Sequence, residues 1–155
     1  MIRTAREYEA ALKKLKQNDD SLSLQQKELI NLGLSDNDMS LAMAPLINFR
    51  NQLKNDIQIY EGIKNKNWEI ILSLVDLHNI GQFLIALRIA FGLTQRELAA
   101  VLGVTEAQVS KDERNEYHGI SFDKAVKIME VFGVKFSRPH VQKNLKKDDL
   151  MAANF

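Results

Sequence analysis

Between Gly92 and Asn115 the chain reads GLTQRELAAVLGVTEAQVSKDERN, and this stretch decides the fold. Its apolar side chains have the spacing of two short helices joined by a tight turn. The apolar positions that such a unit must bury are Leu98, Leu102, Val104 and Val109. Ala99 lies where the two helices cross and lets their backbones approach. Gly103 falls in the turn, where a positive φ costs least.

Two short helices with this spacing form a helix-turn-helix, the unit that places its second helix in the major groove of DNA. The second helix, residues 105–115, carries mostly polar side chains. Because apolar, small and turn residues are constrained together, the pattern is far more specific than a single glycine motif. It predicts a DNA-binding domain.

The composition favours an all-α protein. The 155 residues fit one ordinary domain or two small ones. Hydrophobic residues make up 45% and charged residues 26%, as in globular proteins. Seven Gly and two Pro leave little room for long loops.

Several kinds of chemistry are not expected. The chain has no cysteine, which excludes a disulfide framework, a thiolate metal site and a thiol nucleophile. Its three histidines are scattered, and no Gly-rich phosphate loop is present. The sequence therefore predicts no enzyme, no metal and no cofactor. No apolar run reaches the roughly 18 residues that cross a bilayer, so a cytoplasmic protein without membrane contact is expected.

The charge balance is unusual for a DNA-binding protein. The net charge is +1 and the pI is near 7.9, whereas isolated DNA-binding domains often exceed about 9. Affinity for DNA must therefore come from a few placed contacts, doubled by dimerisation, rather than from bulk charge.

Residues 1–65 are predicted to form an N-terminal helical hairpin or bundle for dimerisation or partner binding. Four residues are suited to helix starts: Thr4, Ser23, Ser35 and Pro45. The segment 18–21 predicts a break between helices, and Gly33 a helix end.

An apolar stripe follows Pro45 at intervals of three or four residues. Its members are Leu46, Phe49, Leu53, Ile57 and Tyr60. The stripe fits an intramolecular helical core, which we favour, or a seam against a second subunit or another partner. Residues 66–77 are predicted to be a linker.

The remaining chain is predicted to be the helix-turn-helix domain, 78–136, and a basic, partly disordered tail, 137–155. A helix from about residue 79 to 91 precedes the motif, ends at Gly92 and buries Ile80, Phe83, Leu84 and Leu87. After the motif, Ser121 caps a helix that ends at Gly133. The apolar residues of this last helix are Phe122, Ala125, Ile128, Met129 and Phe132.

The order of these helices, with ALRIAFGLTQRELAAVLGVTEAQVS, resembles the lambda-repressor-like, Cro and xenobiotic-response-element (XRE) family of bacterial and phage transcriptional regulators. The resemblance covers residues 78–136. It implies a lambda-repressor-like domain that binds double-stranded DNA sequence-specifically. It also implies a homodimeric repressor on an inverted-repeat operator, with residues 105–115 as recognition helix.

The resemblance also implies roles for individual residues. Thr94 and Gln95 would contact phosphate, and Thr105 would cap the recognition helix. Positions that face base edges in the family are occupied by Glu106, Ala107, Ser110 and Lys111. Flanking residues suited to phosphate contacts are Gln108, Arg114 and Asn115. Arg88 and Glu113 match a charge pair that ties the first helix of the domain to the recognition helix.

The sequence departs from the family pattern in three ways: at Asp112, at Glu106 and in the loop after the motif. Asp112 stands where the family buries an apolar or aromatic side chain, and pairing with Arg88, Arg114 or His118 would compensate it. Glu106 is acidic at a groove-facing position, where it would accept from a cytosine amino group or repel phosphate. Tyr117 and His118 replace a Gly-rich turn. They would reach a phosphate or the partner subunit, or pack against the domain, which we favour.

A rival hypothesis comes from the opening MIRTAREYEAALKKL, which is similar to the start of some antitoxins that carry this DNA-binding domain. The N-terminal helices would then neutralise a toxin protein, and the helix-turn-helix would autoregulate the operon. A third possibility is that the helix-turn-helix makes only protein contacts.

Overall fold

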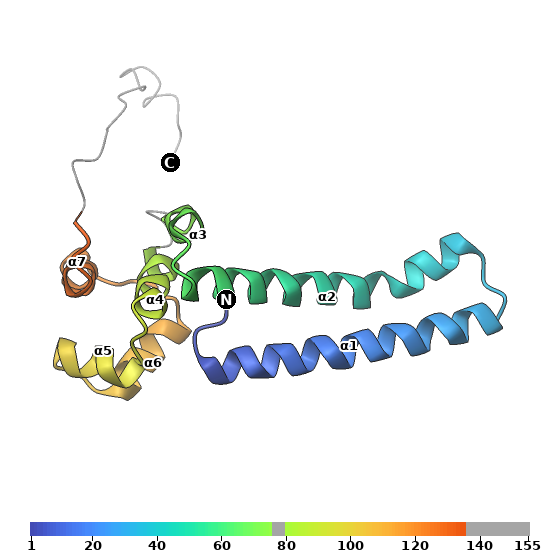
Figure 1. Ribbon diagram of the computed structural model, residues 1–155, viewed down its shortest axis with the longest axis horizontal. Coiled ribbons are helices and arrows are strands. Elements are labelled where there is room, and N and C mark those ends of the chain that lie inside the picture. Colours follow the sequence, from blue (N-terminus) through green and yellow to red (C-terminus); the bar gives the residue numbers. More distant parts are fainter. Residues whose placement is uncertain (76–79, 136–155) are drawn as a thin grey trace, which may run out of the picture.

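The computed structural model describes residues 1–75 and 80–135, which contain seven helices and no strand (Figure 1). The helices are α1 (Ala5–Asn31), α2 (Asp36–Lys64), α3 (Trp68–Ser73), α4 (Ile80–Ala90), α5 (Gln95–Leu102), α6 (Glu106–Arg114) and α7 (Phe122–Val131). The predicted all-α fold is confirmed. The predicted tail, 137–155, lies outside the described residues.

Helices α1 and α2 lie side by side as a long antiparallel hairpin that projects from the other helices (Figure 1). The predicted break at residues 18–21 is wrong, because α1 is continuous to Asn31. The Ser21 hydroxyl donates to the carbonyl of Gln17 (2.9 Å), and the Ser23 hydroxyl to that of Asp19 (3.0 Å). Both hydroxyls therefore bond within the helix instead of capping a new one.

The connection between the two helices follows the sequence prediction. Gly33 follows the end of α1 with a φ of +67°, a conformation that glycine adopts at no steric cost. Ser35 then caps α2 by accepting from the amide of Asp38 at 3.3 Å. Pro45 does not begin a helix as predicted but lies within α2. Its missing N–H costs one backbone hydrogen bond, and α2 bends near its start (Figure 1).

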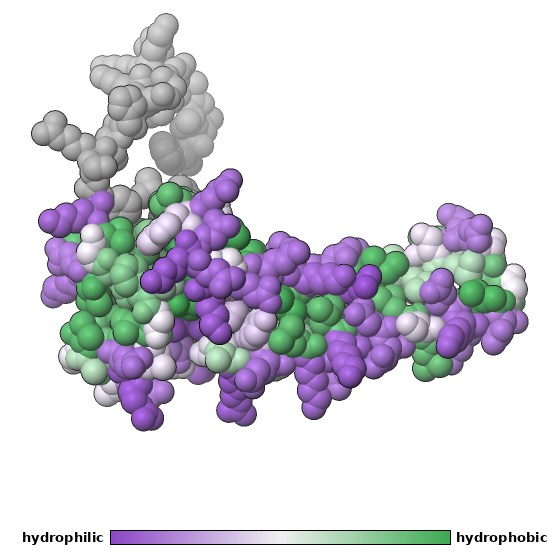
Figure 2. All heavy atoms as spheres, viewed as in Figure 1, coloured by the Kyte–Doolittle hydropathy of each residue, from purple (hydrophilic) through white to green (hydrophobic). Residues whose placement is uncertain are grey.

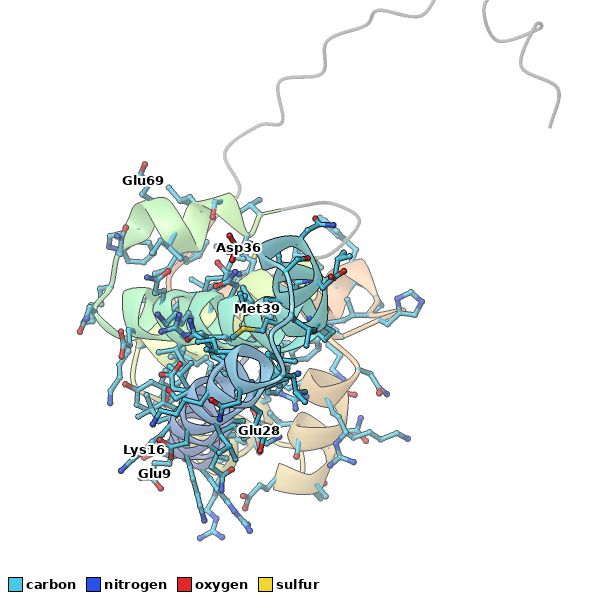
Figure 3. The ribbon with its side chains drawn as sticks, turned by 90° about the vertical axis from the view of Figure 1, so that its right-hand side faces the viewer. Glu9, Lys16, Glu28, Asp36, Met39 and Glu69 are labelled. Atoms are coloured by element: carbon cyan, nitrogen blue, oxygen red, sulfur yellow. The ribbon has the colours of Figure 1, made fainter. Side chains whose placement is uncertain are left out.

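The apolar stripe of α2 packs mainly within the chain. Ile57 and Tyr60 are buried, Leu46 and Leu53 are half-buried, and Phe49 is 44% exposed. The ring of Tyr60 stacks on that of Tyr8 in α1, with centroids 5.0 Å apart. Viewed along the hairpin, Met39 lies on the side of α2 facing α1, whereas Lys16 projects outward (Figure 3). The intramolecular core therefore explains the burial of the end of the stripe nearest α4, which contains Leu53, Ile57 and Tyr60.

The predicted linker contains helix α3. Its Ile71 is fully buried, and Ile70 reaches Gly62 of α2, where a Cβ atom would come within 2.3 Å of the Ile70 Cδ1 atom. Helix α3 therefore packs against the end of α2 and against α4 instead of forming an open connection.

Helix α4 lies at the centre of the second half of the chain. It buries nine of its eleven residues, including Phe83, Leu84 and Leu87, as predicted. Helix α7 begins after the Ser121 cap, and buries Ala125, Ile128 and Met129. Phe122, the first residue of α7, was expected in this core, but it is 72% exposed.

One apolar core joins the base of the hairpin to helices α4–α7. It includes Ile57 and Ile63 of α2, Ile71 of α3 and Leu84 of α4. The far end of the hairpin, by contrast, exposes apolar side chains among polar ones (Figure 2). Among residues 1–75 and 80–135, no helix has the length and apolar character needed to cross a membrane.

Candidate nucleic-acid interface

Helices α5 and α6 form the helix-turn-helix that the sequence predicts. Thr94 caps α5 in a capping box, with its hydroxyl accepting from the Glu97 amide at 3.1 Å. Gly103 makes the turn with a φ of +68°. Leu98, Ala99 and Val109 are buried where the two helices meet. Val104 was also expected to be buried, but it is 40% exposed at the turn.

The recognition helix α6 has a buried side and a polar outer side. Thr105 caps it by accepting from the Gln108 amide at 3.2 Å, and Asn115 ends it. Val109 and Glu113 point into the domain. The outer residues form two neighbouring rows at intervals of four, and so share one broad helix face: Glu106, Ser110 and Arg114 in one row, Ala107 and Lys111 in the other. All of these are exposed except Ser110, which is half-buried.

A buried ion pair fixes the orientation of α6. The Arg88 guanidinium on α4 donates to both carboxylate oxygens of Glu113, at 2.5 and 2.7 Å. Neither side chain is more than 4% exposed. Two parallel hydrogen bonds fix direction as well as distance. The structure thus contains the pair that the resemblance implies.

Further hydrogen bonds complete the environment of this pair. Arg88 also donates to the carbonyls of Leu93 (2.8 Å) and Arg3 (2.9 Å). The Gln95 amide donates to Glu113 at 2.8 Å. In the described structure the side chain of Gln95, expected to contact phosphate, is therefore held by the recognition helix. Gln95 also lines one groove together with Glu106, which lies at the start of α6.

Asp112 has a partner that the sequence did not suggest. Its carboxylate accepts from Lys124 of α7 at 2.7 Å and from the Gln108 amide at 2.7 Å. The expected pairing with Arg88, Arg114 or His118 is therefore wrong. Lys124 becomes available because the turn after α6 folds α7 back toward α6. Gln108 bonds within its own helix, although it was expected to reach phosphate.

Arg96 is a charged residue of the site that the sequence reasoning missed. Its Nε atom donates to the Glu106 carboxylate at 2.9 Å. Both side chains are exposed, so this pair adds little stability. Its effect is electrostatic, because it neutralises the one acidic residue on the outer face of α6. The sequence gives little indication of this pair, because Arg96 and Glu106 belong to different helices.

Tyr117 cannot contact DNA in this conformation. It is 5% exposed and packs beside Gly81 of α4, so the packing interpretation is correct and its inclusion among the DNA contacts is wrong. Burial, together with the charge of Glu113, raises the pKa of its hydroxyl, which stays neutral. His118 in the same loop is exposed, so the packing interpretation is wrong for this residue.

The close approach of this loop depends on glycine. A Cβ atom at Gly81 would lie 1.7 Å from the carbonyl oxygen of Glu116. Glu116 itself has a φ of +49°, so the loop bends sharply against α4. No pattern in the sequence indicates this approach, because Gly81 lies inside a helical stretch.

Taken together, a capped polar helix held outward by a buried ion pair defines a DNA-binding helix-turn-helix domain. The comparison with protein families agrees. Residues 84–138 match the family model described as helix-turn-helix, of the Cro/C1 type in the XRE family. The match covers about a third of the chain and supports a DNA-binding transcriptional regulator of this type. No curated protein and no solved structure matches the chain.

Proposed function

We propose that this protein is a transcriptional repressor that binds an inverted-repeat operator as a homodimer. The observation that carries the proposal is the Arg88–Glu113 pair, which holds α6 with its polar face outward. On that face, Lys111 and Arg114 supply positive charge, and the pairing of Glu106 with Arg96 reduces repulsion of phosphate. Residues 105–115 would lie in the major groove.

The test is binding to the DNA upstream of the protein's own gene, by gel shift against random competitor at two salt concentrations. Selective retention at the higher salt is expected. Binding that random DNA competes away equally would contradict sequence-specific recognition.

Two substitutions on α6 separate base contacts from phosphate contacts. Lys111→Ala is expected to weaken specific binding by about 1–3 kcal/mol if Lys111 contacts a base. Arg114→Ala is expected to weaken binding to all sequences and to lower the salt dependence. The assignment is wrong if both variants behave identically on specific and random DNA.

Dimerisation is assigned to the far half of the hairpin. Apolar side chains are exposed there on both helices: Leu24, Ile30, Leu32, Leu41, Ile47 and Phe49. A second copy of this chain would cover them. Half-sites one turn of DNA apart require that the two recognition helices of the dimer lie roughly 34–36 Å apart.

Analytical ultracentrifugation checks the assignment. The double variant Leu32→Ser/Leu41→Ser is expected to sediment as a monomer, whereas Leu72→Ser, also exposed but on α3, leaves the dimer intact. A monomeric wild-type protein would contradict the proposal.

The same exposed residues support the antitoxin alternative, in which they cover a toxin. If the hairpin variant lost binding to the product of an adjacent reading frame while the wild-type protein stayed monomeric, the antitoxin function would be favoured.

A further inference from the structure

A groove of about 730 Å³ opens where the base of the hairpin meets the helix-turn-helix. We call it the basal groove. Its lining comes from the N-terminal end of α1, the C-terminal end of α2, and the turn between α4 and α5. The lining residues used below are Arg3, Arg6, Lys64, Lys66, Thr94 and Gln95.

The basal groove is strongly basic in a chain that is nearly neutral. Five of its sixteen lining residues are Arg or Lys, and its one acidic lining residue is Glu106. That carboxylate is paired with Arg96, so it offsets little of the groove's charge. Local positive charge of this density attracts an anionic partner even when the net charge is +1.

Among the described residues, three of the five cations have no partner in an ion pair. Arg88 is held by Glu113, and Arg3 by Glu7 at 2.8 Å. Arg6, Lys64 and Lys66 have exposed side chains and form no ion pair within residues 1–75 and 80–135.

The base of the hairpin holds these cations in place. Lys64 ends α2, and Lys66 lies in the turn after it with a φ of +57°. Tyr60, one turn before Lys64, and Ile63, the residue before it, are buried in the common core.

The groove is continuous with the proposed DNA interface. It includes Thr94 and Gln95 at the start of α5, and it reaches Glu106 at the start of the recognition helix. A duplex that lies along the outer face of α6 therefore passes the groove. Cations from two separate helices suit the row of charges on a polyanion better than they suit one small anion.

We propose that the basal groove binds the sugar–phosphate backbone of the duplex beside the segment that α6 reads. Arg6, Lys64 and Lys66 contact phosphates there, so the hairpin takes part in DNA binding and is more than a dimerisation arm. This inference rests on the proposed function.

The test compares two triple variants that remove the same charge. Arg6→Gln/Lys64→Gln/Lys66→Gln alters the groove. Lys16→Gln/Lys27→Gln/Lys54→Gln removes three exposed lysines along the hairpin, of which Lys16 is seen in Figure 3. Affinity for a duplex selected by the wild-type protein is measured by fluorescence anisotropy over a series of salt concentrations. Circular dichroism establishes that both variants fold.

The groove variant is expected to lower the salt slope by roughly 0.9 for each phosphate that is no longer neutralised, or about 2.7 for the three phosphates of each protomer. The control variant is expected to keep the wild-type slope. Hydroxyl-radical footprinting of the groove variant should show less protection at backbone positions flanking the segment read by α6.

Equal slopes for the two variants would overturn the inference while leaving the proposed function intact. The inference would also be overturned if inorganic pyrophosphate bound the wild-type groove and the groove variant kept the wild-type footprint, because the groove would then hold a small anion. Failure of the wild-type protein to retain any duplex would instead overturn the proposed function, and this inference with it.

Discussion

Helix α4 and the hairpin helices bury their residues to very different extents. Nine of the eleven residues of α4 are buried, compared with three of the 27 in α1 and three of the 29 in α2. Helix α4 is surrounded by other helices, whereas α1 and α2 mainly cover each other. The domain that carries the recognition helix is therefore held by a closed core, and the hairpin is held mainly where it joins that core.

The ion pairs of the two regions differ in the same way. Arg88 and Glu113 are at most 4% exposed, while the Arg50–Asp19 pair between α2 and α1 is 39% and 43% exposed. Removing one member of a buried pair leaves an uncompensated charge, whereas water solvates the remainder of an exposed pair. Substitutions are expected to be severe in the first region and mild along the hairpin.

The largest effect is expected from Glu113→Ala. It leaves the Arg88 guanidinium buried without its carboxylate, which costs about 3–5 kcal/mol. Urea unfolding followed by circular dichroism measures the change. Asp19→Ala, in the exposed pair of the hairpin, is the control and should change the midpoint little. Comparable losses of stability in the two variants would contradict the contrast between the regions.

Gly81→Ala is expected to have the next largest effect. Its Cβ atom would lie 1.7 Å from the carbonyl oxygen of Glu116, so backbone must move at a cost of about 3 kcal/mol. Gly62→Ala in α2 is the matched control. There the new atom meets only the end of the flexible Ile70 side chain. Thermal unfolding should separate the two variants, and a stable Gly81→Ala protein would show that the loop does not approach α4 so closely.

A smaller effect distinguishes the base of the hairpin from its far end. Ile63 is fully buried, and Ile63→Val should cost about 0.5–1.5 kcal/mol. The same substitution at Ile30, which is 57% exposed, should have almost no effect on the unfolding of the monomer. If Ile30→Val proved the more costly, the far end of the hairpin would be buried in solution.

The smallest effect concerns the capping box of α5. Hydrogen bonds from the Thr94 backbone amide and hydroxyl lower the pKa of Glu97 from its ordinary value of 4.5. Because the folded pKa is below the unfolded one, the capping box stabilises the fold above about pH 4.5, and this stabilisation disappears as the pH falls through the folded pKa. A carbon-detected NMR titration should place the Glu97 midpoint below 4.5, and a midpoint at or above it would rule out the capping box.

The helix-turn-helix could be predicted in detail because its turns depend on local chemistry. Gly103 and Thr105 each have the residue type that their backbone position requires, and Gly33 and Ser35 succeed in the hairpin for the same reason. The predicted break at 18–21 and the cap at Ser23 failed because a serine hydroxyl either caps a helix or bonds one turn back within it. The packing of α1 against α2 decides whether the hydroxyl caps a new helix or bonds within a continuous one.

The contacts that could not be predicted join residues from separate elements. The partner of Asp112 is Lys124, and that of Glu106 is Arg96. Both depend on the angle between two helices, which spacing does not encode. The pair of Arg88 and Glu113 could be predicted only from the family resemblance. The spacing of apolar residues does not indicate the close approach of Gly81 to Glu116.

The bond between Arg88 and the carbonyl of Arg3 has a mechanical consequence. Arg3 also donates to the carbonyl of Glu113 (3.4 Å), so the segment that leads into α1 is tied to the C-terminal end of the recognition helix. Helix α1 is 27 residues long, about 40 Å at 1.5 Å per residue. A force on the far end of α1 therefore acts about 40 Å from the hydrogen bonds that tie Arg3 to Arg88 and Glu113. A tilt of the hairpin would change the position of the recognition helix through these bonds.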